Sequence, residues 1–114
     1  PGVTWIGRVG QPTLYRELLT SGVFMYPSTH REEHCISAYL AQAAGVWPVV
    51  LPHGALEQSV VFGWKVTDDQ FVDATVAAMR TDDGRQRMAN WIRKWTSWDD
   101  VAASWERLWV GRAA

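Results

Sequence analysis

Two short turns hold the residues of this 114-residue chain that could do chemistry. The first, from Ser28 to Glu33, follows one continuous apolar run, and the second, His53-Gly54-Ala55, follows another and leads into a short helical pattern. Backbone amides at the start of a helix bind anions such as phosphate, and a glycine lets the backbone approach a ligand closely. In an open parallel sheet such turns converge where ligands bind, beyond the carboxyl ends of the strands. The pair therefore predicts an anion-binding site.

A zinc site is a second interpretation, because His30, His34 and Cys35 lie within six residues and imidazoles four apart can share a metal. No clear fourth ligand accompanies them, and a His or Cys in such a turn usually has a structural role. We therefore expect no metal and no cofactor. A nucleophile built from Cys35 and His53 is less favoured still, because Cys35 begins the apolar face of the next helix.

Charge and composition exclude several other classes of function. Eleven Lys and Arg against twelve Asp and Glu leave a net charge of −1, so no basic excess exists to bind nucleic acid. The stretch 85–95 mixes basic residues with tryptophan, but its tryptophans share one helical face, which is typical of an amphipathic helix. No apolar run approaches the ~18 residues of a membrane span. The single cysteine excludes an internal disulfide and suits a reducing compartment, so we expect a cytoplasmic protein.

The elements that position the two turns alternate along the first half of the chain. Apolar runs at 3–6, 23–26 and 48–51 are typical of strands, the last two of buried parallel strands. Between them, Pro12 to Gly22 has the proline-first, glycine-last signature of a helix, and 33–44 has helical periodicity. A further short helix is expected at 56–61. This order predicts an α/β fold with right-handed crossovers and a parallel sheet.

The second half of the chain is helical in pattern and rich in tryptophan. Capping boxes at Thr67–Gln70 and Ser97–Asp100 each precede an apolar stripe. The later stripes carry five of the eight tryptophans: Trp91, Trp95, Trp98, Trp105 and Trp109. We expect these side chains to be largely structural. If the chain is a fragment, the last helix is instead expected to expose an aromatic patch that drives self-association.

The segment from Tyr26-Pro27-Ser28 through Glu33 to Ala41–Val50 (AQAAGVWPVV) resembles the donor-binding region of retaining GT-B glycosyltransferases of the family-four type. The family pattern runs P-S, then E-x7-E-A-x-A-x-G-x-P-V-V, then G-G-x-P-E. Residues 3–9 are similar to a family strand that ends in glycine, and Gly54-Ala55-Leu56 falls at the expected glycine pair. Residues 97–105 resemble the closing helix of the family.

This resemblance implies that residues 1–114 form part of a Rossmann-like, nucleotide-sugar-binding domain, the C-terminal half of a GT-B donor domain with a helical C-terminus. The acceptor domain and the first strands of the donor domain would lie outside this chain. The whole enzyme would transfer a sugar from a nucleotide sugar to an acceptor, and the 114-residue chain alone would be inactive. The donor sugar, its base and the acceptor stay open.

The resemblance also assigns roles to individual residues. Glu33 matches the first glutamate of the pattern, which contacts the transferred sugar and the reaction centre, so it is the expected catalytic residue. The expected donor-binding residues are Ser28, Glu33, His53, Gly54, Ala55 and Leu56.

Two positions depart from the family pattern. Ala41 stands where the family has a ribose-binding glutamate, and Gln58 where it has the later glutamate. Glu32 or Gln42 could substitute for the missing carboxylate, although spacing argues against Glu32. The departures favour an alternative, a non-catalytic binding or assembly module on a degenerate glycosyltransferase scaffold.

Overall fold

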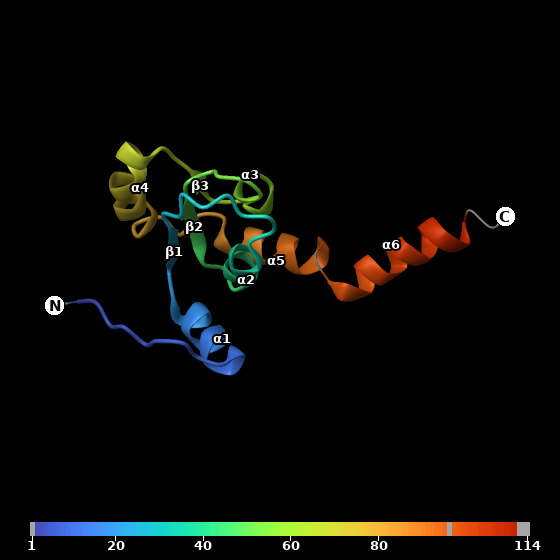
Figure 1. Ribbon diagram of the computed structural model, residues 1–114. Helices are drawn as coiled ribbons and strands as arrows, with labels where there is room; N and C mark the ends of the chain where they lie inside the picture. The colour runs from blue at the N-terminus through green and yellow to red at the C-terminus, as the bar shows by residue number, and fades with distance from the viewer. Residues whose placement is uncertain (1, 96, 112–114) are drawn as a thin grey trace.

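The computed structural model describes residues 2–95 and 97–111 and has an α/β fold, in which a small parallel sheet is flanked by helices (Figure 1). The sheet has the order β1 (Val23–Tyr26), β2 (Trp47–Val50), β3 (Trp64–Lys65), and both pairings are parallel. The helices are α1 (Gln11–Thr20), α2 (Ile36–Ala43), α3 (Leu56–Ser59), the 3-10 turn η1 (Asp68–Gln70), α4 (Phe71–Ala78), α5 (Arg85–Trp95) and α6 (Trp98–Val110). The α/β class and the parallel sheet predicted from sequence are confirmed.

Helices cover both faces of the central strand β2, so its two faces bury different clusters. Val50 packs with residues of α2 and α3, whereas Val49 packs with Phe71 and Ala78 of α4. Figure 1 accordingly shows α4 on one side of the sheet and α2 with α5 on the other. Val49 and Val50 are both fully buried, and burial of one such side chain stabilises the fold by about 1.5–3 kcal/mol. This two-sided burial is why the strand reads as an uninterrupted apolar run.

Local signals set the ends of several helices as expected. Pro12 lies in the first turn of α1, and the capping box of Thr67 and Gln70 is formed at η1. The hydroxyl of Ser97 accepts a hydrogen bond from the Asp100 amide at 3.1 Å, which caps α6. The helix predicted at 33–44 begins later, at Ile36, because Cys35 has φ = 26°, a backbone conformation that cannot continue a helix.

The predicted strand at 3–6 is wrong. These residues form no strand, and Val3 and Trp5 are 92% and 90% exposed. Their residue types favour a strand, but a strand is stable only where a neighbour pairs with it and a surface covers it. The third strand of the sheet is instead the two-residue β3, which the sequence analysis did not identify.

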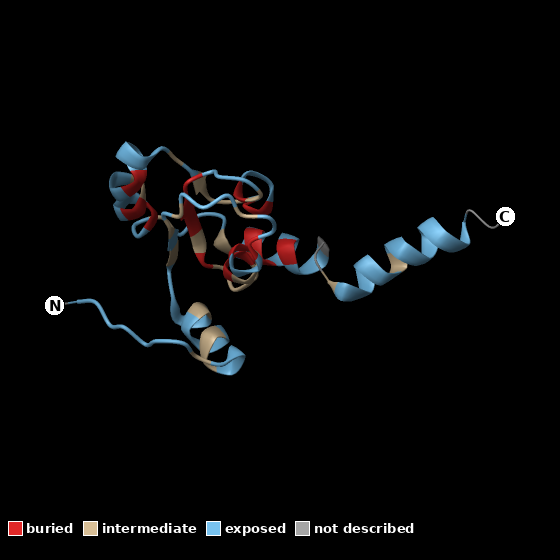
Figure 2. Ribbon diagram, in the orientation of Figure 1, coloured by how far each residue is buried: buried red, intermediate tan, exposed pale blue. Residues whose placement is uncertain are grey.

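The burial predicted for the tryptophan stripe is also wrong for α6. Trp98, Trp105 and Trp109 are 85%, 55% and 71% exposed, and Trp91 of α5 is exposed as well. The side chain of Trp95 lies outside the described part of the chain. Figure 2 shows that α6 projects away from the body of the protein, and only its first turn, with Trp98 and Val101, faces α2 across a shared hollow. An exposed aromatic patch is what we expected of the chain as a fragment.

No helix among the described residues is both long enough and apolar enough to cross a bilayer.

Candidate functional site

The two predicted turns meet beyond the carboxyl ends of β1 and β2. Glu32 and Gly54 form an isolated parallel bridge, and the amide of Ala55 donates to the carbonyl of Glu32 at 2.7 Å. The convergence expected from the sequence is therefore present. We call this surface, residues 28–34 with 53–55, the carboxyl edge.

Gly54 is required at this edge by the neighbouring backbone. Its φ is +62°, and a Cβ placed on it would lie 2.4 Å from the carbonyl oxygen of Glu32. A side chain is therefore excluded by both conformation and space. The sequence interpretation, that the glycine makes room for a ligand, is corrected: it makes room for the first turn.

Two of the predicted donor-binding residues already make contacts within the protein. The Ala55 amide is bonded to Glu32, and Leu56 is fully buried in the cluster beneath α2. In addition, α3 has only four residues, so it offers almost no helix dipole to an anion. Of the amides near Gly54 and Ala55 expected to bind the phosphates, that of Ala55 is therefore already bonded within the protein, whereas the amide of Gly54 has no hydrogen-bond acceptor within the described residues.

The remaining predicted residues keep their side chains at the surface of the edge. Glu33 and His53 are exposed, and neither side chain has a hydrogen-bond partner in the described part of the chain. Ser28 is half-buried, and its hydroxyl accepts from the His30 amide at 3.2 Å. Glu33 was predicted to start a helix, but it precedes the first residue of α2 by three positions. Its availability as a hydrogen-bond acceptor therefore comes from exposure and not from a helix dipole.

A half-buried pair beside these side chains, Tyr26 with Glu32, was not predicted. The Tyr26 hydroxyl donates to Oε1 of Glu32, and this bond, followed by burial, raises the pKa of Tyr26. Burial likewise raises the pKa of the Cys35 thiol, which disfavours the thiolate and agrees with the sequence reading against a cysteine nucleophile. Glu32 and Glu33 are adjacent acids, so spacing alone could not say which one is held by the fold.

The two departures from the family pattern lie in different environments. Ala41 is fully buried on α2, whereas Gln58 is exposed on α3. Because position 41 faces the core, a carboxylate there could not reach a ribose at the carboxyl edge without entering the core.

Gln42, considered as a substitute for the missing glutamate, has a structural role. It is fully buried, and its Nε2 donates to the carbonyls of Ala38 at 3.0 Å and Ser59 at 2.8 Å. Its Oε1 accepts from the amides of Val61 at 3.0 Å and Phe62 at 3.1 Å. All the ordinary hydrogen-bonding positions of the side chain are occupied, so Gln42 cannot bind a ligand. It joins α2 to the segment between α3 and β3.

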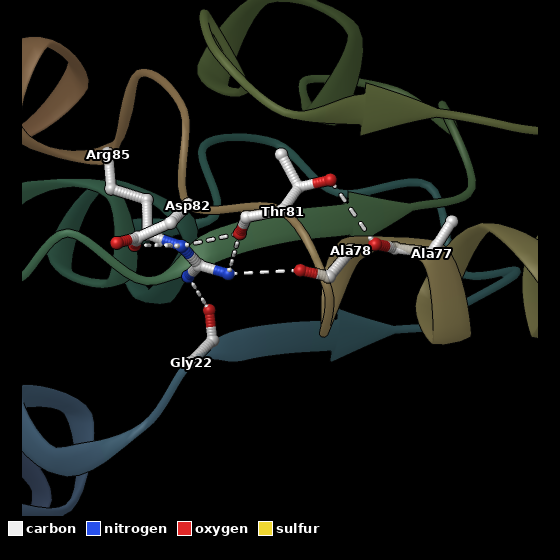
Figure 3. Close-up of polar contacts among 6 residues, drawn as sticks. All are labelled: Gly22, Ala77, Ala78, Thr81, Asp82 and Arg85. Carbon is white, nitrogen blue, oxygen red and sulfur yellow. Dashed lines mark hydrogen bonds and ion pairs between the residues drawn. The ribbon is translucent and has the colours of Figure 1, made fainter.

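Two basic residues of α5, Arg85 and Arg93, make hydrogen bonds to other elements of the fold. Figure 3 shows the Arg85 guanidinium donating to the carbonyls of Gly22, Ala78 and Thr81, with Asp82 beside it at 3.4 Å. Arg93 donates to the carbonyl of Ala43 at the end of α2, at 2.8 Å. These contacts support the interpretation of 85–95 as an ordinary amphipathic helix.

The structure also bears on metal binding and on the location of cavities. Within 2–95 and 97–111, no group of three or more His, Cys, Asp or Glu side chains could hold a metal ion. Hollows of about 360 and 410 Å³ lie along α6. The second is shared with α2 and reaches the carboxyl edge only at His34.

Comparisons with known proteins add no assignment to this geometry. No protein-family model, no curated protein and no solved structure matched the chain.

Proposed function

We propose that this chain is the donor-binding portion of a retaining glycosyltransferase that transfers a sugar from a nucleotide sugar to an acceptor. The observation that carries the proposal is the convergence of the two turns at the carboxyl edge, fixed by the bridge between Glu32 and Gly54. Ligands of open parallel α/β sheets bind at this edge. The resemblance of 26–50 to the donor-binding region of GT-B enzymes supplies the ligand class, and with it a Rossmann-like domain that continues beyond this chain.

In this proposal, different exposed groups of the carboxyl edge bind the sugar and the phosphate of the donor. The Glu33 carboxylate accepts hydrogen bonds from sugar hydroxyls and, in the whole enzyme, stabilises positive charge that develops at the anomeric carbon. The Gly54 amide and the His53 imidazole are the groups available to a phosphate, with Ser28 beside them. Leu56 and Ala55 position this surface from beneath. No other domain is present to bind the acceptor, so we expect no transfer by this chain alone.

A second candidate is a binding module without catalysis on the same scaffold. The specific observation in its favour is that Ala41 is buried, which removes ribose recognition at that position. Such a module would bind a phosphate or sugar without the tight grip on a nucleotide that transfer requires. In either case the single cysteine supports a cytoplasmic setting.

Calorimetric titration separates the two candidates. The chain is titrated with uridine, guanosine and adenosine diphosphate sugars, and with the matching nucleoside diphosphates. We expect one nucleotide sugar to bind, and Glu33→Gln to weaken it about tenfold, equivalent to ~1.4 kcal/mol, without weakening the diphosphate alone. Glu17→Gln is the matched control, because Glu17 is an exposed acid on α1, which contributes no residue to the carboxyl edge. Equal binding by wild type and Glu33→Gln would reject the role of Glu33 and favour the second candidate, and no binding of any ligand would reject both.

A further inference from the structure

The apolar stripe of α6 is the largest exposed aromatic surface on the described part of the chain. Trp98, Val101, Trp105 and Leu108 follow one another at spacings of three, four and three residues, and Trp109 adjoins them. None of the 13 residues of α6 is buried. Beyond its first turn, which faces α2, the helix projects from the body, so most of the stripe is open to solvent (Figure 2).

The area of this surface approaches what a stable interface needs. A tryptophan buries up to ~250 Å² in an interface, so the exposed parts of the three α6 tryptophans alone amount to roughly 500 Å². The half-exposed Val101 and Leu108 add to that area. A standard interface buries about 800 Å² on each partner, whereas single exposed patches on monomers seldom exceed ~600 Å².

The spacing of the stripe indicates the kind of partner. Alternating steps of three and four residues form the seam of a coiled coil, in which one helix packs against another that carries the same pattern. Ala102 and Ser104 flank the seam, and their small side chains allow the two backbones to approach closely. We propose that α6 pairs with α6 of a second copy of this chain, in antiparallel orientation.

Charge favours the antiparallel orientation over the parallel one. Asp99 and Asp100 lie in the first turn of α6, and Arg107 lies in its last turn. Antiparallel pairing brings the acidic end of each helix to the basic end of the other and opposes the two helix dipoles. Parallel pairing would place both acidic ends together, with the dipoles aligned.

The α2 hollow gives the same arrangement a second contact. Trp98 and Val101 line this hollow of about 410 Å³ together with Tyr39 and Ile36, and Ile36 is 64% exposed. In an antiparallel pair, the last turn of the second copy's α6 lies beside this first turn. Its Leu108 and Trp109 can therefore cover the hollow as well as the seam. This inference does not rest on the proposed glycosyltransferase role, because none of the groups proposed to hold the donor lies on α6 or lines this hollow.

Sedimentation equilibrium of the 114-residue chain over about 1–200 μM tests the pairing. We expect a reversible dimer for the wild type, and at least a tenfold weaker dimer for Trp105→Glu and for Trp109→Glu. Trp5→Glu is the matched control, because Trp5 is a 90% exposed tryptophan outside α6, and it should dimerise like the wild type. All three sites are exposed, so circular dichroism should show intact folding in each variant. A monomeric wild type, or equal effects of all three substitutions, would overturn the proposal.

Disulfide trapping tests the orientation. In a Cys35→Ser background, Ala102→Cys lies near the centre of an antiparallel pair and should form a disulfide-linked dimer on mild oxidation. Leu108→Cys lies nearer the end, where its own copy is about 12 Å away along the helix axis, too far for a disulfide, and should not. Efficient cross-linking through Leu108→Cys would establish parallel pairing and contradict the antiparallel proposal.

Discussion

At the scale of single residues, Gln42 is the clearest example of a polar side chain whose role lies in the fold. Replacing it with leucine keeps the size of the side chain but leaves the Ser59 carbonyl and the amides of Val61 and Phe62 without their partner. We expect Gln42→Leu to lower the free energy of unfolding by about 2–4 kcal/mol, because buried polar groups left unpaired carry a full desolvation cost. Urea denaturation measures this loss. Gln58→Leu is the control, since Gln58 is exposed, and should change stability by no more than ~0.5 kcal/mol.

Gly54 makes a separate residue-scale prediction about the carboxyl edge. Alanine at this position combines an unfavourable φ with a clash against the Glu32 backbone. Gly45→Ala isolates the first effect, because Gly45 has φ = +80° but a Cβ there would meet only the Arg85 carbonyl, at 4.0 Å. We expect Gly45→Ala to cost about 1 kcal/mol and Gly54→Ala to cost about 1–3 kcal/mol more. Equal melting temperatures for the two variants would mean that the two turns are not held as described.

Tyr26 predicts how stability changes at alkaline pH. Its pKa is raised above the usual 10.0 chiefly by the hydrogen bond to Glu32, so the folded state holds the phenolic proton more tightly than the unfolded chain does. That contribution is complete below the ordinary pKa and is lost as the pH rises through the raised one. Tyr26→Phe should therefore be less stable than wild type at pH 8, and the difference should shrink above about pH 10. Tyr15→Phe on α1 is the control, and a constant difference between Tyr26→Phe and wild type across this range would contradict the assignment.

At the scale of elements, one arginine joins α5 to the loop and helix just before it and to the distant start of β1. The Arg85 guanidinium bonds the residue before β1, the last residue of α4 and the loop before α5 (Figure 3). Lysine carries the same charge but lacks the planar set of donors. We expect Arg85→Lys to lower the free energy of unfolding by about 1–3 kcal/mol. Arg87→Lys, two residues along the same helix and exposed, should leave thermal unfolding unchanged, and an equal loss in both would show that the effect belongs to helix α5 in general.

The elements that the sequence predicted well are those whose signals are local. Pro12, the capping boxes and the apolar runs of β1 and β2 each determine their element within a few residues. The elements predicted wrongly depend on distant partners. Residues 3–6 have strand-forming types but no neighbouring strand, and β3 pairs over only two residues.

The candidate site likewise has one feature that the sequence predicted and one that it did not. The convergence of its two turns followed from the order of the elements and is observed in the bridge between Glu32 and Gly54, whereas the binding site itself stays a prediction. Which groups at the edge can still bind a ligand depends on hydrogen bonds between the turns. The spacing of residues along the sequence does not predict these bonds. The occupied amide of Ala55 and the buried side chain of Leu56 are the two examples.

At the scale of the whole molecule, the chain consists of a small body and a projecting helix. Its extents are 62 × 30 × 29 Å, and α6 accounts for the long dimension in Figure 1. The carboxyl edge belongs to the body, and the proposed dimer contact belongs to α6. The two proposals therefore concern different surfaces and can fail separately.

The central claim, that the carboxyl edge binds a nucleotide sugar, is tested most directly by amide chemical-shift mapping. The 114-residue chain is titrated with the nucleotide sugar that binds in calorimetry, or with all three at millimolar concentration. We predict shift changes concentrated at residues 28–34 and 53–55, with α1 and α6 unaffected. Saturable shifts confined to any other surface, or none at millimolar ligand, would contradict the claim.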